Sequence, residues 1–255
     1  MTDNRVHILS LRISNISFKQ AIEKVSEMAI HHIPSYVCFA NVHMTIEAHR
    51  DTVFAAKVNA ATLTLADGFP VCKAGSILHN EKLERIAGMD FMPRLLSFMN
   101  EKTGYKVFFY GSTNEVLNEL VSYTQEHYKN VEVAGFISPP FRPLTDQETN
   151  ENIRTINESG AHVVFVGLGC PKQENWMAAN YKKINAVLLG VGGAFLTTAQ
   201  LQKRAPNFMQ KTGLEWLYRL RQEPRRLFKR YFVTNSVFIG LLIKAAAKKI
   251  VHGKP

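Results

Sequence analysis

The sequence predicts an α/β fold: a mainly parallel, Rossmann-like sheet with helices on both faces, followed by a basic helical C-terminal appendage. Three observations predict it. Through residue 200, short runs of β-branched or aromatic residues alternate with longer helical patterns, as in parallel strands joined by helices. The 255 residues are 46% hydrophobic, which is enough for a sizeable core. The last fifth of the chain differs from the rest in its charge.

The alternation predicts strands separated by helices along the first 190 residues. Residues 18–30 and 114–128 each place apolar side chains on one helical face, so both helices can cover a sheet. The proline-rich residues 138–143 are predicted as a loop within the fold, because the strand–helix rhythm continues beyond them. The predicted strands are residues 6–11, 36–40, 62–66, 106–110, 131–136, 162–166 and 186–189.

The charge divides the chain into two parts. Residues 1–202 hold 18 Lys and Arg against 19 Asp and Glu, whereas residues 203–255 hold 13 against 2, a net charge of +11. We therefore predict an α/β catalytic domain over residues 1–202 and a separate appendage over residues 203–255. Nucleic acid, an anionic membrane surface and a phosphate-rich substrate all suit such a basic segment.

The appendage has a helical pattern at residues 214–221, and Pro224 suits the first turn of the helix that follows. Residues 225–232 mix four cations with three aromatic side chains. The apolar run at residues 237–243 is far shorter than the roughly 20 residues that span a bilayer. We expect a helix lying in the membrane interface, with Lys244 and Lys248 among the solvated or lipid-facing cations.

The three cysteines are far apart, form no Cys-x-x-Cys pair and are odd in number. They predict neither a disulfide framework nor a zinc site. The N-terminus lacks the pattern of a secretory signal, so a cytoplasmic location is expected.

Polar residues follow the predicted strands at their carboxyl ends, where parallel α/β sheets bind ligands. Asp67 follows one strand and precedes a glycine; it fits either a helix cap or turn, or a general base. Asn41 follows another and fits either a cap or a hydrogen bond to a sugar hydroxyl. Gly111 and Ser112 follow a third, where a phosphate site and an ordinary helix N-cap are both consistent with the pattern.

The stretch from Gly167 to Glu174 is more informative. Pro171 favours a first helical turn, and the glycines, Gly169 among them, allow a ligand to approach the backbone. Lys172 opposes the helix dipole and so indicates an anionic ligand, whereas Glu174 complements the dipole. The glycines around Gly192 lack the third glycine of a dinucleotide fingerprint and a following acidic residue, so NAD is not expected.

Together these stretches resemble the WecG/TagA/CpsF family of bacterial glycosyltransferases over nearly the whole chain. The resemblance rests on ordered matches: Asp67-Gly68, residues 167–176 and 190–195, Arg204-Ala-Pro, and residues 213–219 and 222–226. It implies inverting transfer of an N-acetylmannosamine-type sugar, or its uronic acid, from a UDP donor to a polyprenyl-diphosphate-linked sugar at the inner face of the cytoplasmic membrane. The products would serve surface polysaccharide or teichoic acid linkage-unit synthesis.

The resemblance also implies residue roles. Asp67 would be the base, Asn41 would lie in the substrate cleft, Gln173 would contact the donor, and arginines of the appendage would close over the diphosphate. Two departures stand out: Phe39 replaces the family's usual Thr, and residues 196–200 lack an Asp and a Gly that many relatives carry. The second departure indicates that the donor sugar differs from the commonest one.

No Asp-x-Asp motif is present, so neither a metal nor a cofactor is expected, and cations would stabilise the departing UDP. The candidate arginines are Arg219, Arg221, Arg225 and Arg226. Expected partners are the UDP-sugar, the polyprenyl-diphosphate acceptor and an anionic membrane, with a homo-oligomer left open and no nucleic acid. Two alternatives remain at this point: a nucleic-acid-binding α/β protein with a basic tail, and a non-catalytic membrane-surface scaffold.

Overall fold

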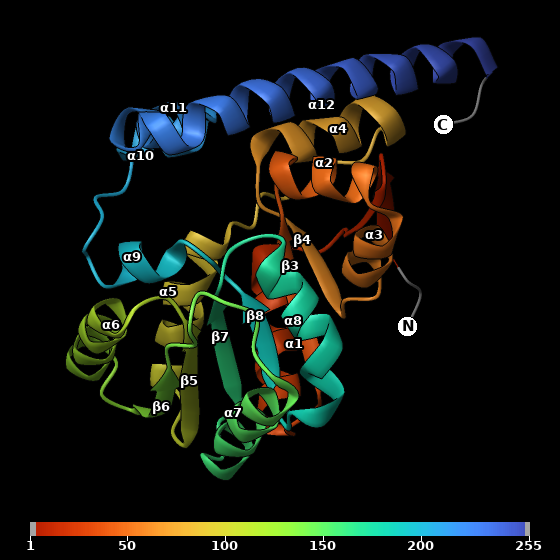
Figure 1. Cartoon of the computed structure of the whole chain (residues 1–255). Helices are drawn as coiled ribbons and strands as arrows, with labels where there is room; N and C mark the ends of the chain where they lie inside the picture. The colour runs from red at the N-terminus through yellow and green to blue at the C-terminus, as the bar shows by residue number, and fades with distance from the viewer. Residues whose placement is uncertain (1–3, 253–255) are drawn as a thin grey trace.

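The computed structural model describes residues 4–252, except the side chains of Asn207, Lys211, Arg226, Arg230 and residues 250–252. Its centre is a six-stranded sheet in the order β4-β3-β8-β7-β5-β6, in which every neighbouring pair is parallel (Figure 1). The predicted parallel α/β fold is therefore confirmed. The strands are β3 (Ser35–Ala40), β4 (Leu63–Ala66), β5 (Tyr105–Gly111), β6 (Val131–Ile137), β7 (Val163–Gly167) and β8 (Val187–Gly190).

The strand predicted at residues 6–11 is wrong. The chain forms an antiparallel hairpin there, from β1 (Arg5–Ile8) and β2 (Leu11–Ser14), outside the main sheet. It turns at Leu9, whose φ of 55° is in the left-handed region. The hairpin lies beside β4, where the backbone N–H of Thr64 donates to Ser14 Oγ over 3.1 Å.

Helices cover both faces of the sheet, and each face has its own hydrophobic cluster. Val37, Val107 and Phe165 point to one face, whereas Cys38, Phe108 and Val164 point to the other, as alternation along a strand requires. The first face is covered by α1 (Phe18–Ile30), α5 (Gly88–Asn100), α6 (Asn114–His127) and α9 (Ala194–Thr198). The second is covered by α2 (Val42–Arg50), α3 (Thr52–Asn59), α4 (Phe69–His79), α7 (Asp146–Glu158), α8 (Lys172–Asn180) and the short 3-10 helix η1 (Tyr181–Lys183).

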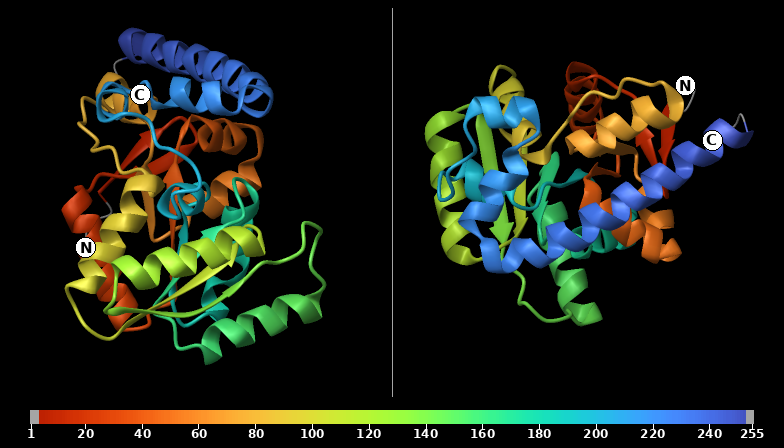
Figure 2. Two further views of the ribbon diagram at one scale, coloured as in Figure 1. Left: turned by 90° about the vertical axis from the view of Figure 1, so that its left-hand side faces the viewer. Right: turned by 90° about the horizontal axis from the view of Figure 1, so that it is seen from above.

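The last part of the chain is helical, as predicted, and forms α10 (Asn207–Thr212), α11 (Glu215–Gln222) and α12 (Pro224–His252). Helix α12 lies across α2 and α4, and both views in Figure 2 show it along the outside of the molecule. Leu227 and Phe238 of α12 are buried, with 0% and 2% of their surfaces exposed.

The apolar run at residues 237–243 is thus divided between two environments. Phe238 packs into the protein core, but Ile239 and Ile243 are 55% and 64% exposed. Only one side of this helix is therefore free to meet a membrane surface. No helix within residues 4–252 combines the length and the apolar character needed to cross a bilayer.

Candidate active site

The carboxyl ends of the six strands form one edge of the sheet, and polar residues or glycines follow each of them. Neighbouring strands are about 4.8 Å apart, so the edge extends over roughly 24 Å, which suits a long substrate. The strand order fixes the sequence of groups along it. From β4 to β6 these groups are Asp67, Asn41, Gly192 with Gly193, the turn from Gly167 to Pro171, Gly111 with Ser112, and loop residues 138–145.

Asp67 is not a helix cap. The N-cap of α4 is Gly68, and no side chain caps this helix. Asn41, in contrast, does cap α2, because its Oδ1 accepts a hydrogen bond from the backbone N–H of Met44 over 3.1 Å. The Asn41 side chain is also hydrogen-bonded to the Asp67 carboxyl group. The structure therefore removes the first alternative for Asp67, a cap of α4, and leaves its carboxylate available for another role.

Burial raises the pKa of Asp67 to about 7. The cations Arg85 and Arg219 and the hydrogen bond from Asn41 oppose this rise, and the carboxylate of Glu215 adds to it. A carboxylate with a pKa near 7 is a stronger proton acceptor than an exposed aspartate and is still ionised at neutral pH to a large extent. Asp67 therefore has the surroundings of a general base.

Arg219 lies between Asp67 and the turn after β8. Its Nη2 atom is 3.0 Å from the point where a Cβ on Gly193 would stand, so the guanidinium lies directly against the backbone of this turn. Within the described part of the chain, Arg219 forms no salt bridge. Its charge does lower the pKa of Asp67. Such a partly exposed, unpaired guanidinium is well suited to bind phosphate oxygens.

For the other predicted arginines, the side chains that the structure describes show no comparable contact with the strand ends. Arg221 and Arg225 are exposed on α11 and α12, and the side chain of Arg226 is outside the described residues. Arg85, which faces Asp67, was not among the predicted site residues. It belongs to the segment between α4 and α5, where no motif marked it.

The turn between β7 and α8 places its three polar residues differently. Lys172 is exposed, but Gln173 and Glu174 are buried, with 4% and 0% of their surfaces exposed. Gln173 Oε1 accepts a hydrogen bond from the N–H of Gly169 over 3.1 Å, and Nε2 donates to the carbonyl of Gly190 over 2.7 Å. Gln173 therefore ties the loop after β7 to the end of β8, and its contact with a donor stays a prediction.

Glu174 extends this internal connection. Its Oε1 accepts a second hydrogen bond from Gln173 Nε2, over 2.8 Å, and burial raises its pKa to about 7. The carboxyl group therefore stabilises the turn from inside, in addition to the predicted effect on the helix dipole. Phe39 is likewise a core residue, 3% exposed and 5.3 Å from the Phe91 ring, so the usual family hydroxyl is replaced by core packing.

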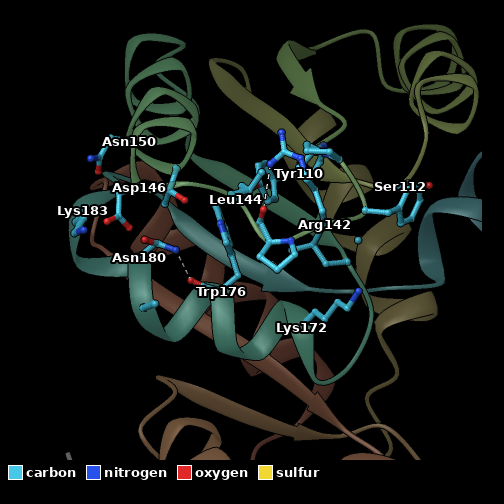
Figure 3. A pocket seen from close by; sticks show the side chains of 18 residues that line it. Tyr110, Ser112, Arg142, Leu144, Asp146, Asn150, Lys172, Trp176, Asn180 and Lys183 are labelled. Carbon is cyan, nitrogen blue, oxygen red and sulfur yellow. Dashed lines mark hydrogen bonds between the residues drawn. The ribbon is translucent and has the colours of Figure 1, made fainter.

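A pocket of about 680 Å³ lies over the carboxyl ends of β5 and β7. Tyr110 and Trp176 stack on its wall with ring centroids 4.2 Å apart. Figure 3 shows Lys172 and Ser112 on one side of these rings and Lys183 on the other. Tyr110 is fully buried behind Trp176, so the half-buried Trp176 ring, with cations around it, is the surface that fits a flat ring system carrying phosphate.

The glycines predicted at this end of the sheet allow a close approach of two backbones. A Cβ on Gly111, whose φ is 113°, would lie 2.7 Å from the carbonyl carbon of Gly167. Ser112 then turns with a φ of 65°, and its carbonyl accepts a hydrogen bond from Ser138 Oγ over 2.8 Å. This bond fixes the proline-rich loop over the pocket. Among the described residues, no three His, Cys, Asp or Glu side chains gather as a metal site would require.

Comparison with known proteins identifies relatives across nearly the full chain. The model of the Glycosyl transferase WecG/TagA/CpsF family matches residues 6–251. A Bacillus subtilis (strain 168) protein named N-acetylglucosaminyldiphosphoundecaprenol N-acetyl-beta-D-mannosaminyltransferase is 29% identical, with 100% of this chain and 97% of that protein covered. A Staphylococcus aureus (strain MW2) protein of the same name is 28% identical, with 96% and 94% covered.

Proposed function

The chain belongs to the Glycosyl transferase WecG/TagA/CpsF family, and we propose that it transfers a sugar from a UDP donor to an acceptor sugar on a polyprenyl diphosphate. The names of its relatives support N-acetylglucosamine on undecaprenyl diphosphate as the acceptor and N-acetylmannosamine as the transferred sugar. The uronic acid of that sugar is the second candidate. Residues 196–200 after β8 lack the Asp and Gly that many relatives carry. The identity of the donor sugar is therefore the first point of specificity to test.

One observation carries the proposal: the order of groups along the sheet edge. The base Asp67 stands at one end, Arg219 is in the middle beside Gly193, and the aromatic pocket lies over β7 and β5. Three to four strand spacings separate Asp67 from the pocket, or about 14–19 Å. An acceptor hydroxyl at Asp67, a diphosphate at Arg219 and a uracil against the half-buried Trp176 fit this order.

The proposed transfer is a single displacement. Asp67 takes the proton of the acceptor hydroxyl while its oxygen forms a bond to the anomeric carbon of the donor. The bond from that carbon to the β-phosphate oxygen breaks on the opposite side, and UDP leaves with the electron pair. This step inverts the anomeric centre, which fits the beta linkage in the relatives' names if the donor is α-linked.

UDP release tests this function directly. Purified protein is mixed with UDP-N-acetylmannosamine and N-acetylglucosaminyl diphosphate on a short lipid, and free UDP is measured. We expect release that requires both substrates. No UDP release in any mixture, with a salt-sensitive affinity for DNA or RNA, would favour the nucleic-acid-binding alternative; vesicle binding without release would favour the scaffold.

We expect turnover to survive metal chelation, because Arg219 and its neighbours can stabilise the departing diphosphate. The measurement is the initial rate of UDP release in excess EDTA against the same rate with added Mg²⁺ or Mn²⁺. We expect the two rates to agree within about twofold. The effect of losing a catalytic metal would be far larger, since each 1.4 kcal/mol added to the activation barrier slows the reaction roughly tenfold. A rate lost in EDTA and restored by either ion would contradict a metal-independent mechanism.

The exposed side of α12 supports attachment to the inner face of the cytoplasmic membrane. Phe228 and Phe232 are 62% and 67% exposed and stack with centroids 6.2 Å apart. Arg225 and Lys229 are exposed on the same stretch of helix. An apolar surface beside cations favours shallow insertion into an anionic bilayer, which is where the acceptor's lipid would be found.

Replacing Phe228 and Phe232 with Ser should reduce cosedimentation with anionic vesicles by about tenfold or more, because two large apolar side chains no longer enter the bilayer. UDP release with a short, water-soluble acceptor should be retained. Substitution is preferable to truncation, since removing residues 234–255 would also take Phe238 from the core. Val53→Ser, at a 63% exposed position on α3, is the matched control; equal losses in both variants would contradict membrane attachment through α12.

A further inference from the structure

Four charged side chains form a ring where the C-terminal appendage meets the α/β domain. Arg85 contacts Asp90 over 2.9 Å and Glu215 over 2.7 Å. Arg204 contacts the same two acids, Asp90 over 2.7 Å and Glu215 over 3.5 Å. Each arginine therefore bridges both carboxylates, and the charges alternate around the ring.

The ring joins two parts of the chain that are distant in sequence. Arg85 precedes α5 and Asp90 lies in its first turn, whereas Arg204 and Glu215 belong to the appendage, 114 or more positions further on. The four side chains are only 15–25% exposed. Partly buried ion pairs are screened less by salt than surface pairs, and a network constrains geometry more than an isolated pair.

A second contact fixes the same junction. Gly213 ends α10 with a φ of 80°, and a Cβ there would be 3.1 Å from the Phe69 ring. Arg85 also lies over that ring, with its guanidinium carbon 5.5 Å from the centroid. The residues directly after Asp67 therefore pack against the turn that begins α11.

The position of the ring on α11 gives it a consequence for the site. Glu215 and Arg219 are four residues apart, so they lie on the same side of the helix, one turn from each other. Holding Glu215 against Arg85 and Arg204 therefore also holds Arg219 near Asp67 and Gly193. Arg219 itself has no ion pair with any of the side chains that the structure describes.

We propose that Arg204 and Glu215 are positioning residues that set Arg219 against the base and the turn after β8. This inference rests on the proposed function and adds to it: the appendage acts on the reacting groups through a ring of ion pairs that need not touch substrate. Arg204 is the better residue to test, because the charge of Glu215 also raises the pKa of Asp67, so a change at Glu215 would alter the base as well.

The test is a double-mutant cycle on the rate of transfer. Arg204→Gln should lower kcat by about 10-fold to 100-fold in the wild-type background, and should have almost no further effect in an Arg219→Ala background, because residues that act through one another are not additive. Arg204→Lys should recover part of the rate. The matched control is Glu132→Gln, which removes the exposed pair between Lys106 and Glu132, 2.9 Å long, and should change kcat in neither background.

A merely structural role for the ring would give losses that multiply in the double variant, and that result would overturn the proposal. A second readout does not depend on activity: hydrogen exchange of the backbone amides in α11 should be faster in Arg204→Gln and unchanged in Glu132→Gln. Unchanged exchange in Arg204→Gln would overturn the proposal whatever the substrate is. An inactive wild-type protein would instead contradict the proposed function, and exchange would then decide the role of the ring alone.

Discussion

Replacing Asp67 with Asn is expected to lower transfer by about 10²-fold to 10⁴-fold, the usual contribution of a general base. The amide keeps the shape of the carboxyl group but cannot accept the proton of the acceptor hydroxyl. The site around it should stay formed, since the N-cap of α4 is Gly68 and not Asp67. UDP binding, measured by calorimetry, should change little. Asp51→Asn is the matched control, because it makes the same change in a carboxylate that caps α3 away from the site.

The pH dependence of the wild-type rate adds a second test of Asp67. A base must be ionised to act, and burial raises its pKa to about 7, so kcat/KM should rise with pH and level off above pH 7. In the folded state the carboxyl group retains its proton between about pH 4 and 7, where the unfolded chain has lost it. Stability therefore falls as pH rises through that window, and Asp67→Asn should be at least as heat-stable as the wild type at pH 8. A variant with normal turnover would leave Asp67 without a catalytic role.

Replacing Arg219 with Ala is expected to lower kcat by about 10²-fold to 10³-fold, by analogy with the loss of other preorganised donors that stabilise developing charge. The structural reason is its place between Asp67 and Gly193, where a leaving diphosphate would gain charge. Arg219→Lys should recover only part of the rate, because an ammonium lacks the planar fork that binds two phosphate oxygens.

Inhibition by UDP separates a diphosphate contact from a general loss of structure. We expect UDP to inhibit the Arg219→Ala variant more weakly than the wild type, while both keep the same melting temperature. Arg154→Ala, at an exposed position on α7, controls for the loss of one positive charge. Full turnover in Arg219→Ala would contradict a role for Arg219 at the diphosphate. Binding to the membrane would then be the remaining role for the arginines of the appendage.

Local signals account for what the sequence could predict. The helix expected at residues 18–30 is confirmed at both ends. Ser17 and Gln20 form a capping box that fixes where it begins. The hairpin was missed because residues 6–11 are mostly apolar, as in one strand, and a leucine at the turn gives no sign of a left-handed φ. Asp67 and Asn41 directly follow predicted parallel strands, and the carboxyl ends of such strands share one edge of the sheet. Their common edge could therefore be predicted from the sequence, but their contacts could not.

The remaining parts of the candidate site depend on pairs that are distant in the chain. Tyr110 near the end of β5 and Trp176 on α8 form the pocket wall together, although they are 66 positions apart in the chain. Arg85 and Glu215 are 130 residues apart, and nothing in either local stretch indicates the other. The family resemblance implies that Gln173 contacts the donor, and this contact stays a prediction; the hydrogen bonds that its amide makes with Gly169 and Gly190 could not be read from the sequence. Such partners are set by tertiary packing, which no local pattern encodes.

The most direct test of the account is the mass of the acceptor after reaction. N-acetylglucosaminyl diphosphate on a short lipid is incubated with the purified protein and UDP-N-acetylmannosamine, and the lipid product is analysed by mass spectrometry. We predict that the acceptor gains the mass of one N-acetylhexosamine residue with the wild-type protein, and that the Asp67→Asn variant yields almost none of this product. An acceptor of unchanged mass with every UDP-sugar supplied, its uronic acid included, would contradict the proposal that this chain is a transferase acting on a polyprenyl diphosphate.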